Sequence, residues 1–423
     1  MARELDIGAL NFVEIVQPGD TVCWGQAAAE PLALTRSLLA QRAAIGGFNA
    51  FVGFNWSDTV DVAYCDHVRY TSYCAIGSNR RLAAAGKLDI IPCHYSQLTE
   101  ILRRKVDVVL LQLAPPDENG NYSLSLACEY LLPLIDSART IVAEVNDRAP
   151  FVPCERLVRA DELDIIVRTS RPLAAVESSI PGRAELAIAK HVAGRIEDGA
   201  VLQMGIGAIP ECVVRALFAH RDLGVHSGMI SDGIAELIEA GSVTNAYKNV
   251  DRGVAIAGVL VGSERLAKFA DRNPNILLRS AEYTHSHSVL KTLDRFTAIN
   301  SAVEVDLTGQ INSETANGRY VGAVGGAVDF LRGAHASRGG LPIVALPATA
   351  VTGSGSASRI VAKLSGPVTT SRADAGIFVT EYGIADLRGL PLASRVKQMI
   401  AIADPSFRET LQREAASYTK GGD

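Results

Sequence analysis

Short apolar runs in this chain alternate with amphipathic stretches, which is the pattern of an α/β protein. Within residues 200–241, the apolar run Val201–Met204 predicts a buried strand, and a glycine turn follows it before a helix opened by Pro210. A second strand at Leu223–His226 precedes a helix capped by Ser231. Helix N-termini at the carboxyl ends of parallel strands offer free N–H groups to anions. The segment is therefore either a ligand-binding edge or a pair of ordinary structural turns.

The two halves of the chain share an order of strand and turn residues. The matching pairs are Gly19–Gln41 with Asp198–His220, Val108–Ser123 with Ser301–Glu314, and Thr140–Asp147 with Gly376–Gly383. Three echoes in one order predict two similar open α/β domains, at residues 1–181 and 182–423, joined by the turn Ser179–Arg183. The length of 423 residues also favours two domains over one.

Composition excludes several classes of protein. With 41 basic and 46 acidic residues, the net charge of −5 argues against a nucleic-acid partner. The chain has no uncharged apolar run of the roughly 18 residues that a membrane span needs, and no apolar export signal is apparent at its start. The seven cysteines lack C-x-x-C spacing and lie mostly in apolar runs, so we expect reduced thiols and a cytoplasmic location.

No metal site is expected. His285 and His287 form a solitary pair, which we interpret as two incidental histidines on one face of a strand. Two common enzyme motifs are also absent. The glycine turn after Met204 has proline where a dinucleotide-binding turn would end in glycine, and GSGSAS lacks the strand and helix of a nucleophile elbow.

Other stretches have compositions suited to a ligand. Gly325 and Gly326 lie in GAVGGAVDF, where their amides could receive a carbonyl or phosphate or simply form a tight turn. Leu346–Arg359 combines hydroxyls, glycines and an arginine, which fits either a phosphate site or a flexible loop. Glu381 ends an apolar strand, and a structural role there is favoured over a catalytic one.

Nine motifs spread over nearly the whole chain resemble one known family. They are AEP at Ala29–Pro31, PPDENG at Pro115–Gly120, AEVND at Ala143–Asp147, QMGIGAIP at Gln203–Pro210, SDG at Ser231–Gly233, AINSAVEVDLTGQ at Ala298–Gln310, VGGAVDF at Val324–Phe330, VTTSRADA at Val368–Ala375 and VTEYGIADLRG at Val379–Gly389. On these motifs the sequence resembles the acetyl-CoA hydrolase/transferase family, and especially its 4-hydroxybutyrate and butyrate CoA-transferase branch.

The resemblance implies a CoA-transferase with an active site between two α/β domains. A glutamate carboxylate would attack an acyl-CoA thioester, form a mixed anhydride and become a glutamyl-CoA thioester. The amides of Gly325 and Gly326 would hold the oxyanion, and Gly205 and Gly207 would line the thioester region. Asn300 would contact substrate. The resemblance implies no cofactor beyond the CoA ester, and a homo-oligomer, either a dimer or a tetramer.

One departure from the family concerns the nucleophile. Relatives carry the glutamate in a His-Ser-Glu-Met type of stretch, where this chain has Gly228, and Ala327 replaces a usual glutamine. Three explanations compete. Another acid serves, namely Glu30, Asp58 or Asp61; or the acceptor's carboxylate attacks the thioester directly in the space beside Gly228; or the chain is inactive in transfer, as an engineered variant or a CoA-ester-binding relative.

The vacated space also bears on which acid is used. A bulkier acid or a second carboxylate could fit beside Gly228, and Arg69, Arg80 and Arg81 could pair with it, although any one of them could equally be solvated surface. We therefore expect CoA transfer from acetyl-CoA or succinyl-CoA to 4-hydroxybutyrate, butyrate or a C4–C5 dicarboxylate such as itaconate. The alternatives are an acyl-CoA hydrolase and a non-catalytic CoA-ester-binding protein.

Overall fold

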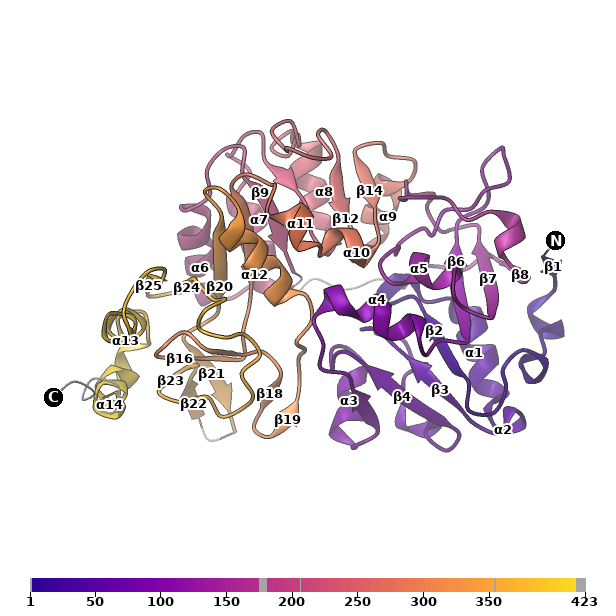
Figure 1. Ribbon diagram of the computed structural model, residues 1–423, viewed down its shortest axis with the longest axis horizontal. Helices are drawn as coiled ribbons and strands as arrows, with labels where there is room; N and C mark the ends of the chain where they lie inside the picture. The colour runs from indigo at the N-terminus through magenta and orange to yellow at the C-terminus, as the bar shows by residue number, and fades with distance from the viewer. Residues whose placement is uncertain (1, 175–180, 206, 354, 416–423) are drawn as a thin grey trace. The chain divides into compact units, whose positions relative to one another are not determined.

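Two mainly parallel sheets organise the chain, one in each of two compact units (Figure 1). The computed structural model describes residues 2–174, 181–205, 207–353 and 355–415. The first unit consists of residues 1–177, 227–232 and 254–286, and the second of residues 178–226, 233–253 and 287–423. Neither unit is continuous in sequence, because two segments from the second half belong to the first unit. The division into domains at residues 181 and 182 stays a prediction.

The first sheet has eight strands in the order β1-β8-β7-β6-β2-β3-β4-β5, and every neighbouring pair is parallel. Its strands are β1 (Arg3–Glu4), β2 (Thr21–Trp24), β3 (Phe48–Phe51), β4 (Val68–Ser72), β5 (Leu88–Ile90), β6 (Val108–Leu113), β7 (Thr140–Asn146) and β8 (Ile165–Thr169). All six residues of β6 are buried. A strand that is buried along its whole length and apolar except for Gln112 is typical of a parallel strand covered on both faces.

Helices and short strand pairs complete the first unit. The helices are α1 (Leu32–Ala40), α2 (Arg42–Ile45), α3 (Asn79–Ala84), α4 (Tyr95–Arg103), α5 (Leu131–Ile135), α9 (Glu264–Ala270) and α10 (Ala281–Thr284). Two parallel pairs come from the second half of the sequence: β11 (Met229–Ile230) with β13 (Val259–Leu260), and β12 (Ala255–Ala257) with β14 (Ile276–Leu278).

The second sheet has six strands in the order β10-β9-β15-β20-β24-β25, parallel except for the last pair. They are β9 (Val201–Met204), β10 (Gly224–Val225), β15 (Phe296–Asn300), β20 (Leu341–Ala345), β24 (Ile377–Thr380) and β25 (Gly383–Asp386). Among its helices are α6 (Arg183–Ala193), α7 (Ala208–Ala216), α8 (Asp232–Glu239), α11 (His287–Leu290), α12 (Ala327–Ala336), α13 (Leu392–Ala401) and α14 (Arg408–Glu414). In Figure 1, α12 lies across the face of this sheet, against β15 and β20.

The two sheets share one topology, which confirms the predicted pair of similar α/β folds. In the first sheet β3-β2-β6-β7-β8 has the order 2-1-3-4-5 along the chain, and β10-β9-β15-β20-β24 has the same order in the second. The first sequence echo correctly matches β2 with β9. The other two predicted matches pair the wrong strands. The counterpart of β6 is β15, whereas residues 301–314 contain β16 (Glu304–Asp306), which belongs to a small separate sheet. The counterpart of β7 is β20, whereas the predicted match contains β24.

Other local predictions need correction. His285 and His287 do not share a strand, because His285 follows α10 in the first unit and His287 opens α11 in the second. The helix predicted to open at Pro210 begins two residues earlier, at Ala208. In the predicted linker Ser179–Arg183, Ser179 and Ile180 lie outside the described residues.

A close backbone approach fixes the chain that leaves β3. The N–H of Ser78 donates to the carbonyl oxygen of Asn55 at 2.9 Å, and Gly77 lies against that oxygen with a φ of +65°. A Cβ added at Gly77 would lie 1.9 Å from the Asn55 oxygen. The contact therefore requires glycine for two reasons, the left-handed backbone and the lack of space.

We predict that Gly77→Ala destabilises the first unit far more than Gly86→Ala. Gly86 has nearly the same φ, +64°, but nothing lies within 4 Å of its added Cβ. Gly86→Ala should cost only the left-handed backbone penalty, roughly 1 kcal/mol, and Gly77→Ala roughly 3 kcal/mol or more. Urea unfolding followed by tryptophan fluorescence measures this directly, since both tryptophans, Trp24 and Trp56, lie in the first unit. Equal losses in the two variants would contradict the contact.

Candidate active site

Each sheet has a point where the strand order reverses, and open α/β sheets bind ligands beside the carboxyl ends of strands at such a point. In the first sheet the reversal lies between β2 and β6, and in the second between β9 and β15. The carboxyl edges there are the places to look for a site, and each is described within its own unit.

Two glycine-rich helix starts meet the carboxyl edge of the second sheet. Gly207, with φ +119°, caps α7 directly after β9. Gly326 caps α12, which runs back along the sheet and ends just before β20 begins, so its N-terminus also lies at the carboxyl edge. Gly325 has φ +56°, which glycine adopts without strain. Among the described residues nothing lies within 4 Å of a Cβ added at Gly205 or Gly207, so this edge has open space.

Asn300 lies at the same edge, as the last residue of β15. Its side-chain amide donates to Oε1 of Gln203 on the neighbouring strand β9, at 3.0 Å. The structure thus brings Asn300 to the carboxyl edge where Gly205, Gly207, Gly325 and Gly326 also lie. Their roles toward a thioester remain predictions.

Arg171 forms hydrogen bonds with several strand ends at the carboxyl edge of the first sheet. Arg171 follows β8, and its Nε donates to buried Glu144 of β7 at 2.5 Å. Its Nη2 donates to Oε1 of Gln112 on β6 at 2.5 Å and to the carbonyl oxygen of Glu30, in the turn after β2, at 2.8 Å. These bonds join the ends of β6, β7 and β8 to the turn after β2, and loss of either ion-pair partner would leave an uncompensated charge at this edge.

Glu30 is a buried carboxyl in the turn after β2. Its Oε1 accepts from the hydroxyls of Thr35, at 3.0 Å, and Thr59, whereas its Oε2 has no partner among the described residues. Burial raises the pKa of Glu30, against the lowering effect of the hydroxyl groups that surround it.

The other predicted acids lie on the surface. Asp58 forms an exposed ion pair with Arg36 at 3.0 Å. Asp61 pairs with Arg81 at 3.3 Å and caps a short 3-10 helix. Arg80 is exposed in the first turn of α3 and has no ion pair among the described residues. The structure therefore buries Glu30, leaves Asp61 partly exposed and places Asp58 and Arg80 in solvent, and Asp58 and Asp61 pair with different arginines.

Gly228 lies in the first unit, directly before β11. Its carbonyl oxygen accepts hydrogen bonds from the N–H groups of Gly258, at 3.0 Å, and Val259, at 3.2 Å. A Cβ added at Gly258 would lie 3.1 Å from the Gly228 oxygen and 2.9 Å from Cγ of Glu129. Gly258 thus separates Gly228 from a carboxyl side chain that our sequence analysis did not select.

Glu129 is a buried acid whose hydrogen bonds, pKa and backbone angle all differ from those of an ordinary glutamate. Its Oε2 accepts from Nε2 of Gln26 at 2.5 Å and from the hydroxyl of Tyr95, while its Oε1 has no partner in the described part of the chain. Burial raises its pKa to about 7, more than the hydrogen bonds from Tyr95 and Gln26 lower it. Its φ is +25°, which is rare for a residue with a side chain. In the sequence, Glu129 is marked only by being the single acid within the apolar run SLACEYLLPL.

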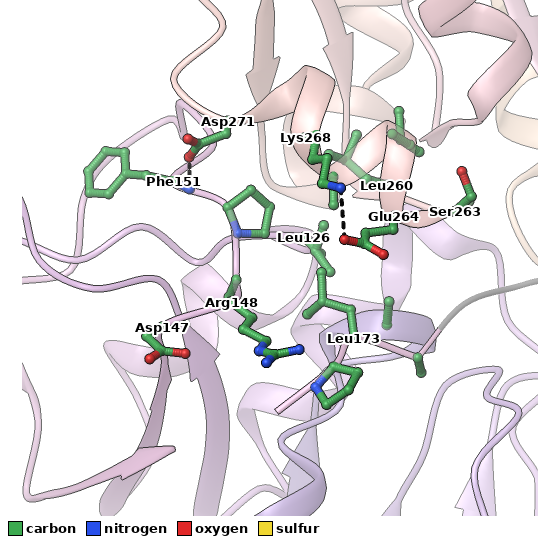
Figure 2. A pocket seen from close by; sticks show the side chains of 18 of the residues that line it. Leu126, Asp147, Arg148, Phe151, Leu173, Leu260, Ser263, Glu264, Lys268 and Asp271 are labelled. Atoms are coloured by element: carbon green, nitrogen blue, oxygen red, sulfur yellow. Dashed lines mark hydrogen bonds and ion pairs between the residues drawn. The ribbon is translucent and has the colours of Figure 1, made fainter. Parts of the chain in front are cut away.

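A cavity of about 500 Å³ lies at the carboxyl ends of β2, β6, β7 and β8 in the first unit (Figure 2). Its walls combine Leu126, Leu173 and Leu260 with charged residues. Lys268 pairs with Glu264 at 2.9 Å, a pair drawn as a dashed line in Figure 2. Arg148 also lines the cavity and forms no ion pair with any described residue. Arg272, which lies over the ring of Phe151, is a second arginine of the lining without an ion pair among the described residues. The cavity therefore offers an apolar body and cations that are not paired with acids.

The described residues contain no group of three or more His, Cys, Asp or Glu side chains that could hold a metal ion. Within the same residues, no helix is both long enough and apolar enough to cross a membrane.

Comparison with known proteins defines the class. Residues 7–177 match the acetyl-CoA hydrolase/transferase N-terminal domain, and residues 262–415 match the C-terminal domain of the same family. The 4-hydroxybutyrate coenzyme A transferase of Clostridium kluyveri is 35% identical over 97% of each chain. The succinyl-CoA:acetate/propanoyl-CoA:succinate CoA transferase of Fasciola hepatica is 36% identical over 84% of this chain and 75% of its own.

A solved structure agrees with these matches. RipA from Yersinia pestis superposes with a TM-score of 0.93 at 29% identity, covering 99% of this chain and 98% of its own. The fold and the sequence matches together define a CoA-transferase. The chain belongs to the acetyl-CoA hydrolase/transferase family. The family, the fold class and the enzyme class expected from the motifs are thus confirmed.

We predict that Glu129 makes stability depend on pH. Folding raises its pKa from 4.5 to about 7, so between these values the folded chain holds a proton that the unfolded chain has released. Its contribution to the free energy of unfolding therefore falls by roughly 3 kcal/mol as pH rises from 4.5 to 7. Glu129→Gln removes this fall. The variant should gain stability relative to the unsubstituted protein between pH 5 and pH 8, as measured by urea unfolding, and a constant difference would contradict the burial of an ionisable carboxyl.

Proposed function

We propose that the protein moves CoA from acetyl-CoA or succinyl-CoA to a short-chain carboxylate. The acceptors we propose are 4-hydroxybutyrate, butyrate or a C4–C5 dicarboxylate such as itaconate. The observation that carries this proposal is the carboxyl edge of the second sheet, where the N-termini of α7 and α12 both begin at glycines. The names of the two sequence relatives, a 4-hydroxybutyrate and a succinyl-CoA transferase, support the choice of acids.

Backbone amides at this edge suit the chemistry of a thioester. When a carboxylate attacks the carbonyl carbon, negative charge develops on the carbonyl oxygen, and preorganised N–H groups stabilise it without reorganisation. The amides around Gly207 and Gly326 belong to helix starts, where N–H groups have no partner within the helix. Asn300 could orient the substrate through its side-chain amide, which Gln203 already positions.

The cavity of the first unit suits the body of a CoA ester. CoA combines an apolar pantetheine arm with phosphates, and the cavity combines leucine walls with the available guanidinium of Arg148. Arginine binds phosphate with two parallel N–H donors. We assign Arg148 to the phosphate-bearing part of the CoA ester.

A dicarboxylate acceptor is supported by two features of the first unit. Gly228, directly before β11, carries no side chain, and Arg80 has a guanidinium without an ion pair among the described residues. A second carboxylate could pair with such a cation. Monocarboxylates such as butyrate need only the first of these features.

Hydrolysis is the second candidate function. If water replaced the acceptor acid, a carboxyl group with a pKa of about 7, such as Glu129, would be a suitable general base. The net reaction would then release free CoA.

The expected result for the unsubstituted protein is exchange of CoA. Incubated with succinyl-CoA or acetyl-CoA and each candidate acid, it should form the new acyl-CoA, which chromatography detects. Free CoA without new acyl-CoA would indicate a hydrolase. Neither product, with binding of the ester by calorimetry, would indicate a CoA-ester-binding protein and contradict the proposal.

Arg148→Ala should weaken binding of the CoA ester. Loss of a hydrogen-bonded charge costs about 1.5–3 kcal/mol, which corresponds to roughly a ten- to hundredfold rise in the KM for acyl-CoA. The KM for the acceptor acid should change little. Arg104→Ala is the matched control, because Arg104 is an exposed arginine that pairs with Glu100 on α4 outside the cavity. Equal KM values in the two variants would exclude the cavity as the CoA site.

A further inference from the structure

The carboxyl group of Glu129 lies one glycine away from the backbone of Gly228. The N–H of Cys128 donates to the Gly258 carbonyl oxygen at 2.9 Å, and the N–H of Gly258 donates to the Gly228 carbonyl oxygen at 3.0 Å. The three segments are therefore joined by backbone hydrogen bonds. Since an added Cβ at Gly258 would lie 2.9 Å from the Glu129 Cγ, only glycine leaves room for the glutamate side chain in this position.

The two carboxyl oxygens of Glu129 differ in their hydrogen bonds. Gln26 and Tyr95 both donate to Oε2, and Tyr73 in turn donates to Oε1 of Gln26 at 3.0 Å, so one carboxyl oxygen is held firmly. The other, Oε1, is buried without a partner among the described residues. A carboxyl group with a purely structural role normally has both oxygens satisfied. One fixed oxygen and one unbonded oxygen instead suit a group that must form a new bond.

The backbone of Glu129 adds a second, independent observation. Its φ of +25° lies outside the regions that residues with a side chain ordinarily occupy. Such strained conformations persist where the surrounding structure enforces them, and they cluster at active sites. Here the enforcing contacts are the backbone bond from Cys128 to Gly258 and the N–H of Ala281, which donates to the carbonyl oxygen of Glu129 at 3.1 Å.

We propose that Glu129 is the carboxylate nucleophile of CoA transfer in this chain, acting beside the backbone of Gly228; this rests on the proposed transferase function. Glu30 also has a buried, unpartnered oxygen, but its bonds come from Thr35 and Thr59. Among the described residues, the Glu30 side chain forms no hydrogen bond with the segments around Gly228 or Gly258, whereas the side chain of Glu129 lies against Gly258.

The reaction balances with no further reactant. A carboxylate oxygen of Glu129 forms a bond to the acyl carbonyl carbon, the C–S bond breaks, and CoA leaves as the thiolate. The thiolate then attacks the Glu129 carbonyl carbon of the mixed anhydride, which releases the first acid as a carboxylate and leaves a glutamyl-CoA thioester. The acceptor carboxylate repeats these two steps in reverse, so the new acyl-CoA departs and the Glu129 carboxylate is regenerated.

Trapping of the glutamyl thioester tests the assignment on the unsubstituted protein. After incubation with succinyl-CoA or acetyl-CoA alone, borohydride should reduce the thioester of Glu129 to an alcohol, so the peptide that contains this residue loses one oxygen and gains two hydrogens. Peptide mass spectrometry locates the change. The same treatment without acyl-CoA should leave the peptide unchanged.

Two glutamine substitutions provide the kinetic test. Glu129→Gln should lower CoA exchange at least a thousandfold and abolish the trapped product. Glu314→Gln is the matched control, because Glu314 is a buried acid that likewise accepts hydrogen bonds from a tyrosine and a second polar side chain, Tyr320 at 2.9 Å and Thr369 at 2.8 Å. It should retain both exchange and trapping.

The outcomes separate the nucleophile from the function. A trapped product on Glu30, Asp58 or Asp61, or exchange without any product on Glu129, would overturn the assignment while the transferase function stands. If no acid supports exchange, the proposed function fails. In that case a trapped product on Glu129 would still support its assignment as the nucleophile, and the absence of a trapped product would overturn this assignment too.

Discussion

The ion pair between Arg171 and Glu144 is the constraint on which the first unit's carboxyl edge depends. Through Arg171 the ends of β6, β7 and β8 are joined to the carbonyl of Glu30, and so to the turn that follows β2. That turn also carries Gln26, which holds Glu129. A buried charge pair is costly to form but more costly to break, because the surviving charge remains buried. The arginine therefore acts on the candidate nucleophile at a distance, by fixing the loop that orients it.

Close backbone packing decides which carboxyl group can act near Gly228. Glycine at position 258 admits the side chain of Glu129, and a Cβ at this position would also lie 3.1 Å from the carbonyl oxygen of Gly228. The helix starts at the second sheet's edge need glycine for a different reason, because Gly207 and Gly325 adopt positive φ angles. In this chain glycines thus provide both the room for a reacting side chain and the backbone geometry suited to an oxyanion.

Local patterns were sufficient for much of the fold. The strand, glycine turn and helix around Val201–Met204 were predictable because each step has its own residue signal, and the echo of this segment at Gly19–Gln41 correctly matched β2 with β9. Glu129 was not predictable. Its partners Gln26 and Tyr95 are distant in sequence, and a single acid in an apolar run carries no spacing signal. The positions of Asp58 and Asp61 were likewise not predictable, because their ion-pair partners Arg36 and Arg81 lie about 20 residues away in sequence.

The discontinuity of the first unit has a consequence for how the protein is made. Its chain leaves after residue 177 and returns for residues 227–232 and 254–286. Although domains of a growing chain generally fold in order from the N-terminus, this unit cannot be completed until residue 286 has emerged from the ribosome. The partner strands β12, β13 and β14 arrive late. Until then, the apolar residues that these strands cover in the folded unit stay exposed on the nascent chain, as does the carboxyl group of Glu129. Exposed apolar surface makes such an incomplete unit prone to aggregation.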